Sequence, residues 1–256
     1  MAKKEKPKFP SEIVPLPSKG HFYPEGHPLT KGEVEVKYMT AREEDILTSQ
    51  NLIKQGKVID VLLESLVIGD FDMDDMFIGD KNAVMIAARI LGYGKEYQFE
   101  LDDPATGEKE TQVLDLTTLE HKEIDLSKIE EGTNEFDYEL PFSKKKLTFK
   151  MLTQGDEKQI AEELKALRKV TKKSGIESEV TTRLKKVITS IDGDSTVGTI
   201  NNFVNNEFLS RDSRAFREHL MSVTPDVDLD IIVDFTSGEE VEITVPMTVE
   251  FFWPKS

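Results

Sequence analysis

The chain of 256 residues contains no cysteine. This absence excludes disulfide bonds, thiolate nucleophiles and the structural zinc sites that use cysteine ligands. No apolar run approaches the roughly 20 residues that a membrane-spanning helix needs. The first ten residues, MAKKEKPKFP, are basic, but no apolar segment follows them, so they do not predict a secretion signal. Together these absences favour a cytosolic protein that does not associate with membranes.

Positive charge is also scarce, with 33 Lys and Arg against 49 Asp and Glu and a net charge of −16. General nucleic-acid binding is not expected, because phosphate contacts need a basic surface. The same charge disfavours anionic membranes and favours basic protein partners. Residues 144–173 are an exception, since they are rich in Lys and Arg. They predict either a solvated helix face or a contact with an acidic neighbour, such as another copy of this chain.

The chain contains an internal repeat, because PLTKGEVEVKYMTAREEDIL (28–47) aligns without a gap with PFSKKKLTFKMLTQGDEKQI (141–160). In each copy, alternating apolar residues predict a strand. A threonine follows at the N-cap position, and an acid three residues later suits the positive end of a helix dipole. Each copy therefore predicts a strand that runs directly into a capped helix.

Both copies continue through helical patterns and end in a β-hairpin signal, at residues 96–116 and 228–247. The predicted fold class is α+β, with two related lobes from an internal duplication. Each lobe has a strand, helices and a β-hairpin, and the antiparallel sheets pack with helices. The predicted domains are listed here: an extended N-terminal arm (1–27), a first lobe (28–116), an acidic connector (117–140), and a second lobe with a C-terminal aromatic strand (141–256). The end of the connector, residues 136–140, alternates and predicts a strand beside the first strand of the second copy.

Motifs for catalysis or metal binding are weak. The spacing of HFYPEGH (21–27) matches no metal-ligand pattern, and GDFDMDDMFIGD (69–80) lacks the alternate acids and closing Glu of a calcium loop. Asp72 and Asp80 are better interpreted as helix caps. No nucleophile elbow or P-loop is present. We therefore expect no enzyme activity, no metal and no cofactor.

The stretch IVPLPSKGHFYPEGHPL (13–29) is a candidate partner-binding arm. Its prolines extend the chain in advance, which lowers the entropy lost on docking. Its apolar side chains supply area to bury, and the candidate contacts are Leu16, Phe22, Tyr23 and Leu29. Two alternatives remain open, since the arm can dock on a neighbouring subunit or on its own domain.

A second candidate partner-binding site is VEFFWPKS at residues 249–256. Phe251 and Trp253 would share one face of a final strand, and Phe252 would point the other way. This strand either closes the core or presents an aromatic anchor to a partner.

The lead-in PLPSKGHFYPEGHPLTKGEVEVKYMTAREEDIL, the element ILGYGKEYQF and the ending VEFFWP resemble the baseplate hub protein family of T-even-like contractile-tailed bacteriophages. The resemblance covers roughly residues 10–254. It implies a non-enzymatic phage tail protein, a component of the baseplate hub or an assembly factor for it. The alternative is a tape-measure-binding tail assembly chaperone that is not retained in the virion. No catalytic residues come with the family.

The implied partners are other baseplate or hub proteins and the tape-measure protein. Self-association is a further expectation from the charge pattern. The implied location is the host cytoplasm during assembly, and the virion tail baseplate if the protein is retained.

Overall fold

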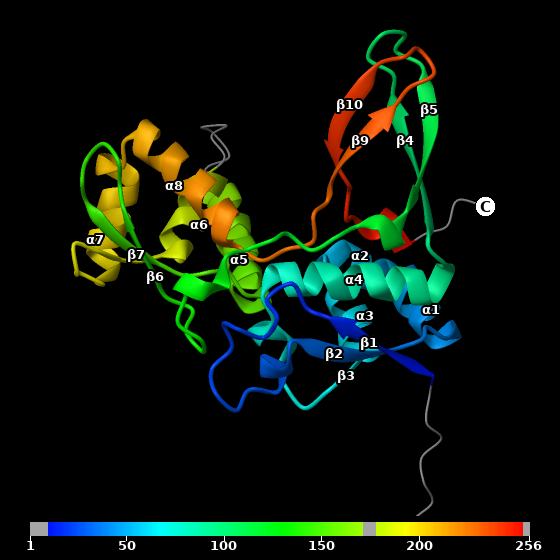
Figure 1. The fold of residues 1–256 in the computed structure, drawn as a ribbon, viewed down its shortest axis with the longest axis horizontal. Helices are drawn as coiled ribbons and strands as arrows, with labels where there is room; N and C mark the ends of the chain where they lie inside the picture. The colour runs from blue at the N-terminus through cyan, green and yellow to red at the C-terminus, as the bar shows by residue number, and fades with distance from the viewer. Residues whose placement is uncertain (1–9, 171–177, 253–256) are drawn as a thin grey trace, which may run out of the picture.

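The computed structural model describes residues 10–170 and 178–252 (Figure 1). Its antiparallel sheets of two or three strands pack with helices, which confirms the predicted α+β class. None of the helices within these two ranges combines the length and apolar character needed to cross a membrane.

The elements of the first part are listed here: β1 (Ser11–Pro15), β2 (Glu33–Lys37), α1 (Ala41–Thr48), α2 (Gln50–Gln55), α3 (Val58–Leu66), β3 (Val67–Ile68), α4 (Ile78–Tyr93), β4 (Glu96–Asp102) and β5 (Lys109–Asp115). Short 3-10 helices are η1 (Pro28–Lys31), η2 (Met73–Asp75), η3 (Leu116–Thr118) and η4 (Leu126–Lys128). The second part has β6 (Phe136–Glu139), β7 (Lys146–Phe149), α5 (Gln154–Val170), α6 (Glu179–Val187), β8 (Ile188–Ile191), α7 (Val197–Asn202), the π-helix η5 (Phe203–Glu207), α8 (Ser210–Val223), β9 (Asp230–Asp234), β10 (Glu240–Thr244) and the 3-10 helix η6 (Val249–Phe252).

The first sheet has the strand order β1-β2-β3, so the described part of the predicted arm begins as an edge strand of this sheet. Val14 pairs with Val34, and both side chains are buried. Residues 10–27 are therefore not a separate arm, which corrects the predicted boundary at 28. The pairing adds Val14 of β1 to the buried face of the sheet, whereas Ile13 on the opposite face is exposed.

The second sheet repeats this order as β6-β7-β8. Tyr138 pairs with Leu147, which confirms the strand predicted at the end of the connector. Strand β8 occupies the end of a helical sequence pattern at residues 176–191, which by itself predicts a helix up to residue 191. The helix α6 ends at Val187, and the next four residues form β8, an edge strand that pairs with β7.

Two separate hydrophobic cores result. The second core is built from buried residues between Leu140 and Phe216, whereas the first core gathers residues 14–116, Met151 and the stretch from Val227 to Phe252. The hairpin β9–β10 therefore belongs with the first core, not with the second lobe as the boundary 141–256 predicted. Figure 1 shows β9–β10 beside β4–β5, above α4. A single hairpin has too little core to be stable alone, so the two bury their apolar faces together.

The order of elements repeats along the chain: two antiparallel strands, helices, a third strand, a helical segment (α4 in the first part and α7, η5 and α8 in the second) and a hairpin. This order supports the hypothesis of internal duplication. On this hypothesis the first copy starts at β1, since β1 has the place in its sheet that β6 has in the second sheet.

Candidate functional site

The four candidate contacts of the N-terminal segment lie in the first core. Leu16, Phe22, Tyr23 and Leu29 are each at most 2% exposed. They are therefore unavailable to another protein unless this core opens, which agrees with the second of the two alternatives, docking of the segment on its own domain. The physical reason is burial, since four large apolar side chains on one loop gain most by covering the nearest apolar helix.

A buried carboxylate fixes this lead-in loop, which we define as residues 16–32. Asp80 accepts hydrogen bonds from the Ser18 amide (2.9 Å), the Ser18 hydroxyl (2.7 Å) and the Tyr23 hydroxyl (2.7 Å). Asp80 is the third residue of α4 and not its cap, so the predicted capping role is wrong. Burial raises the pKa of the Asp80 carboxyl, although the three donors act against this. Burial and the nearby Asp80 also raise the pKa of Tyr23.

The lead-in loop in turn supports the connector. The Nε2 atom of His21 lies 2.9 Å from the carbonyl oxygen of Ile129, and the amide of Gly132 donates to the carbonyl of His21 (2.7 Å). The ring of Phe22 packs edge-on against Phe136, with ring centres 5.9 Å apart. Residues 129–136 are thereby held in place by residues that are more than 100 positions away in the sequence.

The second core has its own buried carboxylate at the matching place. Asp212 is the third residue of α8 and accepts hydrogen bonds from the amides of Phe142 and Ser143, both at 2.9 Å. Burial acts to raise the pKa of Asp212, but the hydrogen bonds from Ser143 and Phe142 outweigh it, and the pKa is lowered. Each of the two cores thus ties a strand-to-strand turn to the first turn of a helix.

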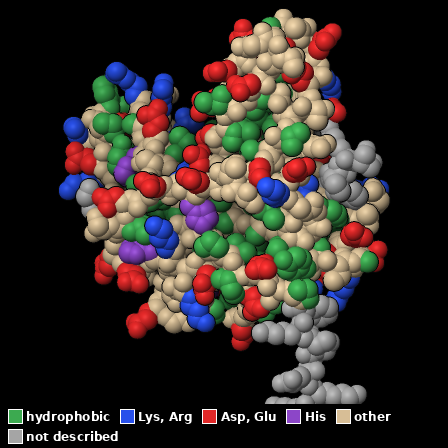
Figure 2. Space-filling model, turned by 45° about the vertical axis from the view of Figure 1, so that its right-hand side comes forward, with side chains coloured by type: hydrophobic (Ala, Val, Ile, Leu, Met, Phe, Trp, Pro, Cys, Tyr) green, Lys and Arg blue, Asp and Glu red, His purple; other side chains and the backbone are tan. Residues whose placement is uncertain are grey.

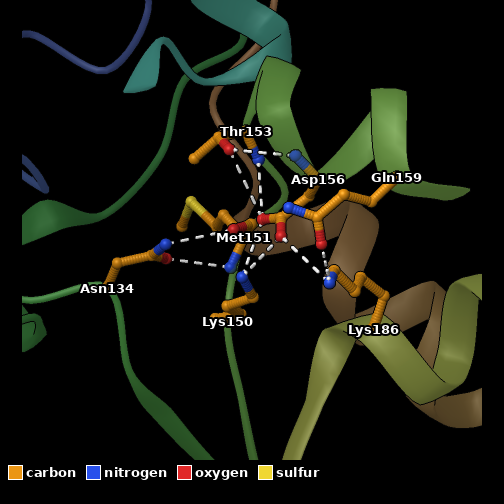
Figure 3. A network of polar contacts seen from close by, with 7 residues as sticks. All are labelled: Asn134, Lys150, Met151, Thr153, Asp156, Gln159 and Lys186. Atoms are coloured by element: carbon orange, nitrogen blue, oxygen red, sulfur yellow. Dashed lines mark hydrogen bonds and ion pairs between the residues drawn. The ribbon is translucent and has the colours of Figure 1, made fainter. Parts of the chain in front are cut away.

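The junction of β7 and α5 is held by a polar network (Figure 3). The ammonium of Lys150 donates to both oxygens of Asp156 (2.8 and 2.7 Å), and Asp156 also accepts from the amide of Thr153 (3.2 Å). The Asn134 side chain pairs with the backbone of Met151 through both of its amide atoms (2.8 and 3.0 Å). The network therefore fixes the strand-to-helix turn and anchors the connector to the junction of β7 and α5.

In the first copy the corresponding acid is Glu43, and it forms the predicted capping box with Thr40. It also accepts from Lys37 (2.9 Å) and Ser65 (2.6 Å). Burial acts to raise the pKa of Glu43, but these hydrogen bonds outweigh it and lower the pKa to about 2. Glu43 and Asp156 thus each stabilise the turn between a strand and the helix that follows it.

The C-terminal aromatic pair is also buried. Phe251 and Phe252 are 0% exposed and lie on the 3-10 helix η6, so the predicted final strand is wrong and neither ring is an exposed anchor. The guanidinium of the buried Arg89 donates to the carbonyl of Phe251 (2.9 Å), and the Tyr97 ring packs on Phe251. These contacts close the first core. Trp253 lies outside the described residues.

A groove of about 920 Å³ lies between the connector and the second core. Its apolar lining consists of Ile124, Ile129, Phe136, Phe149 and Val223. Its polar lining consists of Asp125, Glu130, Thr133, Glu135, Asp137, Thr148, His219 and Ser222. The lining therefore contains four carboxylates and no Lys or Arg among the described residues that form it. Sequence patterns could not reveal this groove, because its walls come from separate segments.

His219 forms part of the groove floor. Its ring stacks on Tyr138 with centres 4.3 Å apart and meets the edge of Phe149 at 5.8 Å. Burial lowers the pKa of His219, so the imidazole is neutral near pH 7. The floor is thus aromatic and uncharged, and the charge of the groove comes from its rim.

Within residues 10–170 and 178–252, no three His, Asp or Glu side chains are grouped as metal ligands would be. Neither protein-family models nor curated proteins nor solved structures gave a match to this chain. The groove is therefore the strongest candidate functional site, and the chemistry that it offers is burial of apolar side chains beside acidic groups.

Proposed function

We propose that this chain is a non-enzymatic assembly protein of the baseplate hub of a contractile-tailed bacteriophage. The observation that carries the proposal is the groove, which has the apolar floor and polar rim of a protein-binding surface. The partners in this proposal are other baseplate or hub proteins and the tape-measure protein. The protein acts in the host cytoplasm during assembly and lies in the tail baseplate if it is retained.

The stretches that carry the family resemblance support this proposal through their positions. The Ser18 and Tyr23 side chains bond the buried Asp80, and Thr40 caps α1. Phe251 and Phe252 close the first core. The resemblance therefore concerns residues that build the fold, as expected for a family of structural proteins, and not residues that line a catalytic pocket.

The charge distribution supports self-association as a secondary proposal. Residues 136–224 carry 16 Lys and Arg against 13 Asp and Glu, whereas the rest of the chain carries 17 against 36. Figure 2 shows Lys and Arg side chains gathered on the lobe at the left, which holds the second core. Opposite charges on two ends of one molecule favour head-to-tail encounters between copies.

Quantitative mass spectrometry of gradient-purified phage particles tests the proposal. Peptides of this chain are counted against a tail protein of known copy number. A fixed whole-number ratio supports a hub subunit. Absence from particles, together with a tape-measure complex in infected cells, supports the alternative assembly chaperone. Absence from particles and from every complex with tail proteins contradicts both roles.

A further inference from the structure

We propose that the groove between the connector and the second core binds a basic amphipathic segment of a partner protein. In this complex the partner's apolar side chains cover the groove floor, and its Lys and Arg side chains face the acidic rim. This inference rests on the proposed function and deepens it, because it states the chemistry of the partner at that site.

The floor of the groove is apolar. The Phe136 and Phe149 rings stack with centres 5.3 Å apart, and the remaining apolar lining comes from Ile124, Ile129 and Val223. Phe136 and these three aliphatic side chains are only partly buried in the isolated chain. Removing this apolar surface from water favours a ligand with an apolar face. Aromatic rings also attract cations across their faces, which suits a ligand with Lys or Arg next to its apolar residues.

The rim of the groove is acidic. Glu130, Glu135 and Asp137 are exposed, and no basic side chain of the described lining neutralises them. His219 does not offset their charge, because burial keeps the imidazole neutral near pH 7. Such a rim attracts a cationic segment and repels an acidic one. It also disfavours nucleic acid and anionic lipid, so a protein segment is the occupant that fits.

The groove lies between the connector and the second core. One wall belongs to the connector, which the lead-in loop holds through His21 and Phe22, and the other wall is the C-terminal part of α8. Both walls are therefore fixed before a ligand arrives, so little ordering entropy opposes binding. A single amphipathic helix laid into an apolar groove is an established mode of recognition.

The experiment uses the purified full-length chain and a synthetic 14-residue peptide of Lys and Leu, with leucines at helical spacing. A second peptide has Glu in place of every Lys. Fluorescence anisotropy of the labelled peptides gives the dissociation constants. We expect the Lys peptide to bind at least about tenfold more tightly than the Glu peptide. Equal or weaker binding of the Lys peptide would overturn the proposal.

Three variants locate the binding. The rim variant Glu130→Lys/Glu135→Lys should weaken binding of the Lys peptide by about tenfold or more. The control variant Glu240→Lys/Glu242→Lys changes the net charge equally at exposed positions on β10 and should change the affinity less than about twofold. If the control weakens binding as much as the rim variant, the attraction comes from the overall charge and the proposal fails.

The floor variant Ile124→Asp separates groove binding from simple electrostatic attraction. It adds a negative charge, so electrostatic attraction alone would strengthen binding of the Lys peptide. Occupation of the groove predicts at least about fivefold weaker binding, because the apolar contact is lost. If this variant does not fold, the exposed rim variant still decides the question. Loss of a dimer in the rim variant, measured by sedimentation, would instead assign the groove to a second copy of this chain.

The outcomes for the groove and for the proposed function are separable. Failure of peptide binding, with the chain present at fixed ratio in phage particles, overturns the groove assignment alone. Specific peptide binding by a chain that is absent from particles and tail complexes overturns the phage proposal and leaves the groove assignment standing.

Discussion

The two strand-to-strand connections, one in each core, are closed by the same kind of backbone hydrogen bond but differ in length. In the first, the amide of Leu16 bonds the carbonyl of Gly32, and in the second the amide of Leu140 bonds the carbonyl of Lys145. Each leucine is followed by proline, and each connection donates at least one backbone amide to a buried aspartate. Fifteen residues separate the bonded pair in the first core and four in the second. The same closing hydrogen bond therefore accommodates loops of very different length.

The difference in length decides what is exposed. The long lead-in loop carries Phe22, Tyr23 and Leu29 into the first core. The short turn carries Phe142, which is 59% exposed and lies beneath the guanidinium of Arg211 at 5.1 Å. One unit thus covers the start of its helix with its own chain, and the other leaves an aromatic side chain in water. This comparison teaches that the proline- and aromatic-rich stretch is a core element and not a free arm.

Replacing one phenylalanine of each connection, Phe22 in the long loop and Phe142 in the short turn, should have the largest effect. Phe22→Ala removes a buried ring packed on Phe77 and Phe136, so the free energy of unfolding should fall by about 4 kcal/mol. Phe142→Ala should change it by less than about 1 kcal/mol, because the ring is exposed. Urea denaturation measures both. Similar losses of unfolding free energy for the two variants would show that the two loops contribute equally to their cores, contrary to this comparison.

The matched aspartates sharpen the comparison. Asp80→Ala leaves the Ser18 and Tyr23 donors buried without a partner and should cost about 3 kcal/mol. Asp80→Asn should cost less than Asp212→Asn, since the raised pKa of Asp80 shows that its site already disfavours the charged form, whereas the pKa of Asp212 is lowered. Thermal unfolding of the three variants is the check. A larger loss for Asp80→Asn than for Asp212→Asn would contradict the assigned electrostatics.

Glu43 predicts a pH dependence. Its pKa falls from an ordinary 4.5 to about 2 in the folded chain, so its contribution is present above pH 4.5 and is lost as the pH falls towards 2. This contribution is about 3 kcal/mol at neutral pH. Glu43→Gln should therefore flatten the fall in stability between pH 4.5 and 2. Urea titrations at several pH values test this, and parallel curves for the variant and the parent would argue against it.

The smallest expected effect concerns the helix caps. Thr40 and Thr153 begin matching helices, and replacing either by Ala should cost about 1 kcal/mol. A loss at only one of the two threonines would show that the repeats differ at this turn. Chemical denaturation of the two single variants measures it.

Local signals in the sequence predicted the local structure well. Thr40 with Glu43, the alternation at Val34 and Val36, and the glycine-containing turns predicted the capped helix, its strand and the hairpins, because neighbouring residues determine these features. Strand β8 was missed, since its four residues continue the apolar pattern of α6.

Long-range pairing could not be predicted in this way. The loop of Phe22 folds onto its own core, and β9–β10 crosses to the first core, through contacts between residues far apart in sequence. The buried Arg89 gave no signal, because it bonds backbone carbonyls and not an acid. The groove also depends on long-range placement, since its lining comes from residues 124–137, β7 and α8.

Hydrogen exchange followed by mass spectrometry, on the full chain with and without the Lys–Leu peptide, tests the central claim most directly. We predict that residues 16–29 exchange slowly in both samples, because they belong to the first core. Residues 124–137 should exchange more slowly in the sample with the peptide than in the sample without it. Rapid exchange of residues 16–29 in the free chain, with protection appearing on peptide binding, would contradict the account and restore a partner-binding arm.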